Sequence, residues 1–125
     1  MREIKFRAWN LRDKKMYQNV QECEEYYNAC FSSWLKPEFD ALMQFTGLKD
    51  KDGKEIYEGD ILSCENTPFP KLLLIVYWDE KRAIFNLRQG ENTTTSFLLS
   101  ENYLYEVIGN IYENANLHSY KIIHP

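Results

Sequence analysis

Apolar and basic residues alternate along residues 4–9, near the start of the chain. This period of two is typical of a half-buried β-strand. The polar stretch 10–15 can form a turn, and residues 16–20 can return beside the first strand. The pattern therefore predicts an N-terminal β-hairpin.

The next segment has apolar residues at near-helical spacing, namely Val20, Cys23, Tyr27, Cys30, Phe31 and Trp34. A helix fits this spacing, and an aromatic-rich irregular strand fits the composition. Both alternatives stay open for residues 21–36. Pro37 ends either one, because the residue before a proline disfavours helical geometry.

Turn signals become clear from residue 42 onward. Residues 42–46 look extended, and 47–54 form a polar turn region with the hairpin signal Asp52-Gly53. Gly59-Asp60 is a second turn pair, and it opens the next strand. Later strands are predicted at 72–78, 83–87, 93–99 and 106–112, with Gly109 indicating a bulge or close packing. A single helical turn fits residues 113–117.

Five short strands joined by short turns can therefore be counted from Ile61 onward. Closing into a small barrel is the simplest way for such strands to hide their edges. The predicted fold is mainly β: a small β-barrel, an N-terminal β-hairpin and a variable segment that is open to helix. We expect a single domain over 1–125, with the hairpin and variable segment in 1–41 and the barrel in 42–125.

The chain shows no feature of a membrane or exported protein. Its longest apolar run, 72–78, is far shorter than the roughly 20 residues that span a bilayer. The first residues form no apolar signal segment. We therefore expect a cytoplasmic protein without membrane contact.

Charge is unevenly distributed, although the formal net charge is only −4. Residues 1–20 hold six basic and two acidic side chains, so the hairpin is the one candidate for nucleic-acid contact. In that alternative the basic side chains bind phosphates and Trp9 stacks on a base; the basic residues are Arg2, Lys5, Arg7 and Arg12. The simpler interpretation, which we favour, has Trp9 in the barrel and the basic groups in solvent.

No constellation of residues predicts catalysis. The two histidines, His118 and His124, both lie near the end of the chain, and no phosphate-binding loop is present. The cysteines lack the close pairing of a zinc site. Acidic residues gather between 50 and 60, but lysines interleave with them, which favours a solvated turn over a cation site. We expect no enzyme activity, no cofactor and no bound metal.

Aromatic residues are abundant, with nine tyrosines in the chain. Tyrosine combines a large contact area with a hydroxyl that favours water or an interface. We hypothesise a protein–protein or self-association surface that includes Tyr26, Tyr27, Tyr57, Tyr103 and Tyr105. The alternative is a set of tyrosines scattered around the rim of the barrel.

Three sequence blocks, 2–9, 43–61 and 106–114, resemble the YopX family of small phage and prophage proteins. The middle block, which runs from Met43 to Ile61, is long and specific, and the three blocks in order cover nearly the whole chain. Ala115 departs from the proline that the family often has there, and residues 18–41 match nothing in the family.

The resemblance implies an SH3-like barrel in the C-terminal part and a homo-oligomer. It implies no established activity and no catalytic residues. The three blocks are best explained as structural turns, at Gly47, Gly53, Gly59, Asp60 and Gly109.

The expected role is a phage or prophage accessory protein that acts through protein contacts and self-association. Two alternatives remain. One is a nucleic-acid-binding module that uses the basic hairpin. The other is a stoichiometric inhibitor of a host protein, such as a defence enzyme, in which case the partner is an unknown host or phage protein.

Overall fold

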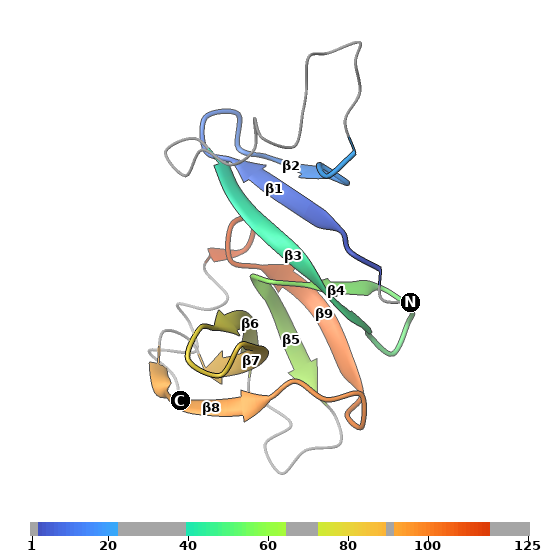
Figure 1. Ribbon diagram of the computed structural model, residues 1–125, viewed down its shortest axis with the longest axis vertical. Helices are drawn as coiled ribbons and strands as arrows, with labels where there is room; N and C mark the ends of the chain where they lie inside the picture. The colour runs from blue at the N-terminus through green and yellow to red at the C-terminus, as the bar shows by residue number, and fades with distance from the viewer. Residues whose placement is uncertain (1–2, 23–39, 65–72, 90–91, 116–125) are drawn as a thin grey trace. The chain divides into compact units, whose positions relative to one another are not determined.

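The computed structural model describes residues 3–22, 40–64, 73–89 and 92–115 (Figure 1). The chain divides into two compact units, Met1–Gly47 and Leu48–Pro125. The described residues are mainly β-strands, as predicted. The boundary between the units follows Gly47, inside a strand. The single domain stays a prediction.

The first unit contains the predicted N-terminal hairpin. Strand β1 (Phe6–Asn10) pairs antiparallel with β2 (Lys15–Gln18), and on its other side with β3 (Asp40–Lys49). A hydrogen bond of 3.1 Å from the Val20 amide to the Phe6 carbonyl extends the pairing of β1 beyond β2. Among the described residues of this unit, the buried apolar side chains are Ala8, Val20, Met43 and Phe45. The predicted hairpin is therefore confirmed, but burial does not follow the predicted alternation, because Ile4 is 55% exposed and Arg7 is 6% exposed.

The turn between β1 and β2 is built by one side chain. The Asn10 Oδ1 atom accepts the amides of Arg12 and Asp13, while the Asn10 carbonyl accepts the Lys14 amide. Asp79 and Asn110 begin turns of the same design. Short side-chain acceptors that mimic backbone turns explain why Asn and Asp occupy these positions.

The second unit begins with the end of β3, which turns back into β4 (Glu55–Tyr57). Five further strands form one antiparallel sheet in the order β8-β7-β6-β5-β9. They are β5 (Asp60–Cys64), β6 (Leu74–Asp79), β7 (Ile84–Gln89), β8 (Asn92–Leu98) and β9 (Tyr105–Asn110). The sheet is curled into a half-barrel, as expected for a small β-barrel (Figure 1). The predicted count of five strands is confirmed.

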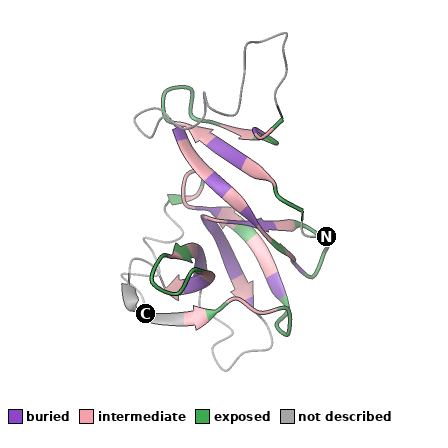
Figure 2. Cartoon of the chain, in the orientation of Figure 1, coloured by how far each residue is buried: buried purple, intermediate pink, exposed green. Residues whose placement is uncertain are grey.

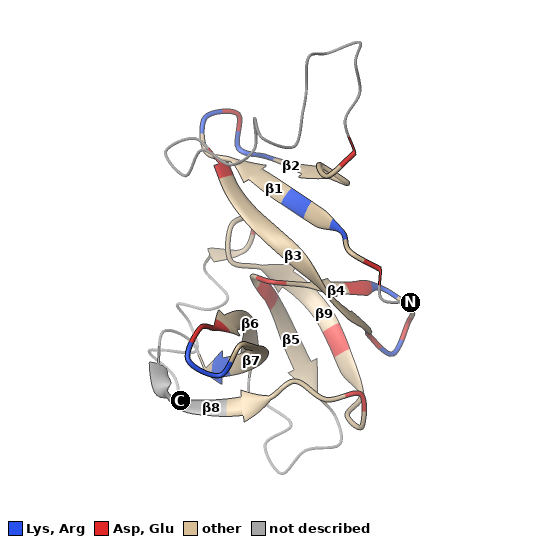
Figure 3. Ribbon diagram, in the orientation of Figure 1, with Lys and Arg blue, Asp and Glu red and all other residues tan. Residues whose placement is uncertain are grey.

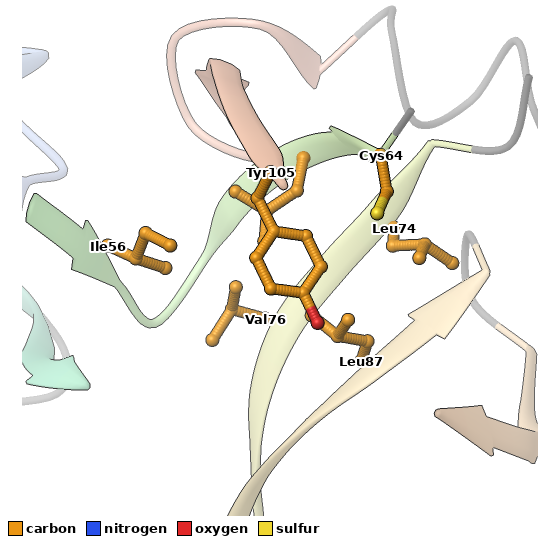
Figure 4. Packing of buried hydrophobic residues seen from close by; sticks show 7 residues of the cluster. Ile56, Cys64, Leu74, Val76, Leu87 and Tyr105 are labelled. Atoms are coloured by element: carbon orange, nitrogen blue, oxygen red, sulfur yellow. The ribbon is translucent and has the colours of Figure 1, made fainter. Parts of the chain in front are cut away.

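The core of the second unit lies on the inner side of this curled sheet. Its buried cluster consists of Ile56, Leu62, Cys64, Leu74, Val76, Leu87 and Tyr105. The Tyr105 ring lies among the aliphatic side chains in Figure 4. Strands β5 and β6 carry much of the buried surface in Figure 2, as the nearly continuous apolar run in β6 predicts.

Two different physical reasons account for glycine at the predicted positions. Gly59 has a φ of 83°, a left-handed conformation that favours glycine; Gly47 and Gly53 share this property. Gly109 does not, but a Cβ atom there would lie 2.5 Å from the Asn114 Oδ1 atom. A register shift of β5 against β9 also lies beside Gly109. The turn predicted at 47–54 starts later, because β3 continues to Lys49.

Two predicted elements fall on residues that the structure does not describe. The helix or irregular strand at 21–36 lies outside the described residues, apart from its first two positions. The helical turn at 113–117 extends past the described residues, although residues 111–113 form a turn. Within the described part of the chain, no helix has the length and apolar character needed to cross a membrane.

Candidate interaction surface

Two of the five proposed interface tyrosines belong to the core instead. Tyr57 is 4% exposed and Tyr105 is 3% exposed. Tyr57 ends β4 and Tyr105 begins β9. Both side chains are buried in the second unit, so neither ring is available for a surface. Tyr103 is 39% exposed and remains a surface candidate. Tyr26 and Tyr27 lie outside the described residues.

The buried Tyr105 nevertheless organises the segment before it. Its hydroxyl accepts a hydrogen bond from the Ser100 amide, 3.1 Å away, and approaches the Leu98 carbonyl at 3.5 Å. Burial raises the pKa of Tyr105 above its ordinary value of 10.0, although the Ser100 hydrogen bond acts in the opposite direction. The hydroxyl is therefore neutral at physiological pH and holds the connection from β8 to β9 in place.

This connection exposes three large apolar side chains. Leu98 is 67% exposed, Leu104 is 52% exposed, and Tyr103 lies beside Leu104. We call this group the 98–104 surface. The Tyr103 amide donates to the Ser100 carbonyl, and the Asn102 amide donates to the Ser100 hydroxyl. The connection is thus held by its own hydrogen bonds, while Leu98, Tyr103 and Leu104 are exposed.

Sequence reasoning missed Leu98 and Leu104 as surface residues. It assigned Leu98 to a strand, where an apolar residue is normally expected to be buried. A signal was present, because Leu104 stands between two tyrosines directly after the polar run Ser100-Glu101-Asn102. The structure was needed to show that Tyr105 is buried while its neighbours Tyr103 and Leu104 are exposed.

The acidic segment 50–60 is not simply a solvated turn, contrary to the prediction. Asp50 and Asp60 are both buried. The Asp60 Oδ2 atom accepts the Tyr57 amide at 2.8 Å, which closes the turn that contains Gly59. The prediction failed because short carboxylates can bond to nearby backbone amides and become buried with them. Asp52 and Lys54 are exposed, as expected.

Asp50 accepts three backbone hydrogen bonds. Its Oδ1 atom takes the amides of Asp52 and Lys54, and its Oδ2 atom takes the Val107 amide from β9 at 3.0 Å. Burial raises the pKa of Asp50, but the three amide donors and the Lys54 charge outweigh it and lower the pKa below 3.8. The carboxylate is therefore ionised at neutral pH and serves as a structural acceptor.

The described residues contain no group of three or more side chains suited to hold a metal ion. Among the cysteines, Cys64 is a buried free thiol in the core, and Cys23 and Cys30 lie outside the described part of the chain. Both Asp50 carboxylate oxygens and the Asp60 Oδ2 atom accept backbone amides.

The basic side chains of the hairpin differ in their exposure. Arg7 is buried at 6% exposure, so it is not a phosphate ligand at the surface. Lys5 forms an ion pair with Glu3, with 2.9 Å between Nζ and Oε2, and lies over the Phe45 ring. Trp9 is half-buried and Arg12 is exposed; Arg2 lies outside the described residues. Basic and acidic segments alternate along the hairpin (Figure 3).

Comparison with known proteins identifies the family of this chain. No curated protein matches it. The chain is similar to a solved structure, the crystal structure of protein EF1440 from Enterococcus faecalis, with 26% sequence identity and a TM-score of 0.61. The match covers 94% of this chain and 99% of that one. The family model described as YopX protein matches residues 5–118. The chain therefore belongs to the YopX family.

Proposed function

We propose that this protein is a non-catalytic accessory protein of a phage or prophage that acts by binding other proteins through the 98–104 surface. The observation that carries the proposal is an ordered connection with exposed large apolar side chains. Leu98 and Leu104 are more than half exposed, and both lie within a segment fixed by hydrogen bonds. Large apolar side chains exposed within one short segment fit an interaction site.

The rigidity of the connection supports binding more than exposure alone does. A flexible loop loses conformational entropy when a partner orders it, and this loss weakens the complex. Here the Tyr105 hydroxyl, the Ser100 carbonyl and the Ser100 hydroxyl already hold the connection. The apolar side chains are therefore presented in a preorganised form.

Nucleic-acid binding is a weaker proposal, because a central arginine of the hairpin is buried and a lysine is paired with glutamate. Inhibition of a host protein is compatible with the same 98–104 surface and differs only in the identity of the partner. The experiment below therefore tests the surface first.

The test compares proteins captured from host lysate by three forms of the chain. The double variant Leu98→Ser, Leu104→Ser removes the apolar groups of the surface. Leu11→Ser is the matched control, because Leu11 is a 44% exposed leucine in the hairpin turn of the first unit. We expect proteins retained by wild type and by Leu11→Ser to be lost from the double variant. Equal capture by all three forms would contradict the proposal.

A further inference from the structure

Basic side chains are concentrated where β1 turns into β2. Residues 11–15, which form this turn and the first position of β2, are all exposed. Three of them are basic, namely Arg12, Lys14 and Lys15, and one, Asp13, is acidic. Figure 3 shows the basic segments on both sides of the acidic one. This segment, which we call the basic turn, is therefore locally positive although the chain carries a net charge of −4.

The two lysines of the basic turn form no ion pair with the described residues of the chain. The ion pairs there involve other basic side chains, and neither Lys14 nor Lys15 takes part in one. The acid between the basic residues has a partner of its own, because the Tyr17 hydroxyl donates to the Asp13 Oδ2 atom over 3.3 Å. The two exposed ammonium groups can therefore pair with carboxylates of another molecule.

The basic turn is ordered before any partner binds. The Asn10 Oδ1 atom accepts the amides of Arg12 and Asp13, and the Asn10 carbonyl accepts the Lys14 amide at 2.8 Å. The Asn10 Nδ2 atom donates to the buried Asp40 at 3.0 Å, which holds the Asn10 side chain in place. A segment that is already ordered loses less conformational entropy when it binds.

The basic turn also contains an exposed apolar side chain. Leu11 is 44% exposed and directly precedes Arg12. Nucleic acids bind proteins mainly through phosphates and, when single-stranded, through stacking on aromatic rings. An aliphatic leucine adds little to either contact. A protein segment that mixes carboxylates with apolar side chains can both pair with the lysines and bury the leucine.

We propose that the basic turn binds an acidic segment of a partner protein, one in which Asp or Glu residues lie beside apolar side chains. The proposal goes beyond the proposed function, because it concerns a different surface, in the first unit, and a partner of stated chemistry. Contacts between exposed charges are screened by salt, so this binding should weaken as the ionic strength rises.

The test uses a fluorescently labelled peptide of repeated Glu-Glu-Leu units and measures its binding by fluorescence anisotropy. We expect the variant Lys14→Asn, Lys15→Gln to bind the peptide roughly fivefold to tenfold more weakly than wild type. Asparagine suits position 14, because Lys14 has a φ of 54° and asparagine adopts such conformations more readily than most residues. Lys49→Gln, Lys81→Gln is the matched control, because it removes the same charge from two other exposed lysines. The control should bind like wild type.

Two further probes test the chemistry of the partner. A peptide with serine in place of leucine should bind wild type more weakly, and Leu11→Ser should bind both peptides equally. Single-stranded oligothymidylate and phosphatidylserine vesicles are the competing partners. If either bound more tightly than the peptide, and lost affinity in the Lys14→Asn, Lys15→Gln variant, an acidic protein segment would be the wrong partner.

Measurements on wild type keep the test decisive if the lysine variant does not fold. Peptide binding should weaken with added salt, and the changes in amide chemical shift should be largest in residues 11–15. Absence of binding at low salt, or shift changes confined to other residues, would overturn the inference.

The failure of this inference is distinguishable from that of the proposed function. If the peptide binds through Lys14 and Lys15 while the Leu98→Ser, Leu104→Ser variant captures the same host proteins as wild type, the proposed function alone is contradicted. If that variant loses captured proteins while wild type does not bind the peptide, this inference alone is contradicted.

Discussion

The Asp50 carboxylate accepts the Val107 amide over a distance of 3.0 Å, and so joins residues that lie 57 positions apart in the sequence. The same carboxylate holds the turn 50–54 through the amides of Asp52 and Lys54. One side chain therefore shapes a local turn and attaches it to the edge strand β9. This places a structural requirement on a residue that looks like an ordinary turn aspartate.

Replacing Asp50 should destabilise the protein. We expect Asp50→Ala to lower the free energy of unfolding by about 3 kcal/mol, because three amides lose a charged acceptor. The control is Asp52→Ala in the same turn, where the side chain is exposed and the loss should stay below about 0.5 kcal/mol. Urea denaturation measures both values. Equal losses for the two variants would show that the carboxylate is not the structural element.

Stability should also depend on pH through Asp50. Its pKa is below 3.8 in the folded chain, so its contribution is complete above pH 3.8 and is lost as pH falls through the folded pKa. Asp50→Asn resembles the protonated acid. The difference in unfolding free energy between wild type and Asp50→Asn should therefore shrink as the pH falls below 3.8. A difference that stays constant into strong acid contradicts the assignment.

Asp79 also has a lowered pKa: burial acts to raise it, but the amides and the charge of Arg82 outweigh that effect. Asp79 is present in both wild type and Asp50→Asn, so its titration cancels in the difference between their unfolding free energies. The remaining pH dependence belongs to Asp50.

Gly109 and Asn114 should be energetically coupled. Gly109→Ala forces the Asn114 side chain away, since the new Cβ atom would lie 2.5 Å from Oδ1. That movement removes the hydrogen bond from the Asn110 amide to Asn114 Oδ1. We expect each single variant to cost about 1–2 kcal/mol, and the double variant Gly109→Ala, Asn114→Ala to cost less than their sum by about 1 kcal/mol. A double-mutant cycle by urea denaturation measures this. Strict additivity would disprove the contact.

Removing the Tyr105 hydroxyl should loosen the 98–104 surface. Tyr105→Phe keeps the ring in the core but leaves the Ser100 amide without its acceptor. We expect a loss of about 1 kcal/mol in unfolding free energy and faster hydrogen exchange at Ser100. Tyr103→Phe is the control, because the Tyr103 side chain is exposed and should change neither value. Unchanged exchange at Ser100 in Tyr105→Phe would contradict the role of the hydroxyl.

If the 98–104 surface is preorganised, the Tyr105→Phe variant should also bind partners more weakly than wild type. Tyr105→Phe should capture fewer proteins than wild type even though it keeps Leu98 and Leu104. The physical reason is that a partner must then order the connection itself. Quantitative comparison of the captured proteins measures this effect.

The sequence by itself determined the strands and most of the turns. Alternation in residues 4–9, the apolar run of β6 and the glycines at 53 and 59 are local signals, and each acts through the conformations available to a few adjacent residues. The five strands of the second unit and the bulge beside Gly109 could therefore be predicted. The resemblance of three sequence blocks to the YopX family was enough to indicate the family.

Only the tertiary structure decided which side chains face inward. Tyr103 and Tyr105 are the same residue type two positions apart, yet Tyr103 is exposed and Tyr105 is buried. Arg7 and Asp50 are charged and buried, because tertiary contacts supply partners such as the Val107 amide that lie far away in the chain. Burial depends on such long-range contacts, whereas propensity depends on neighbours, so the candidate surface could not be located before the fold was known.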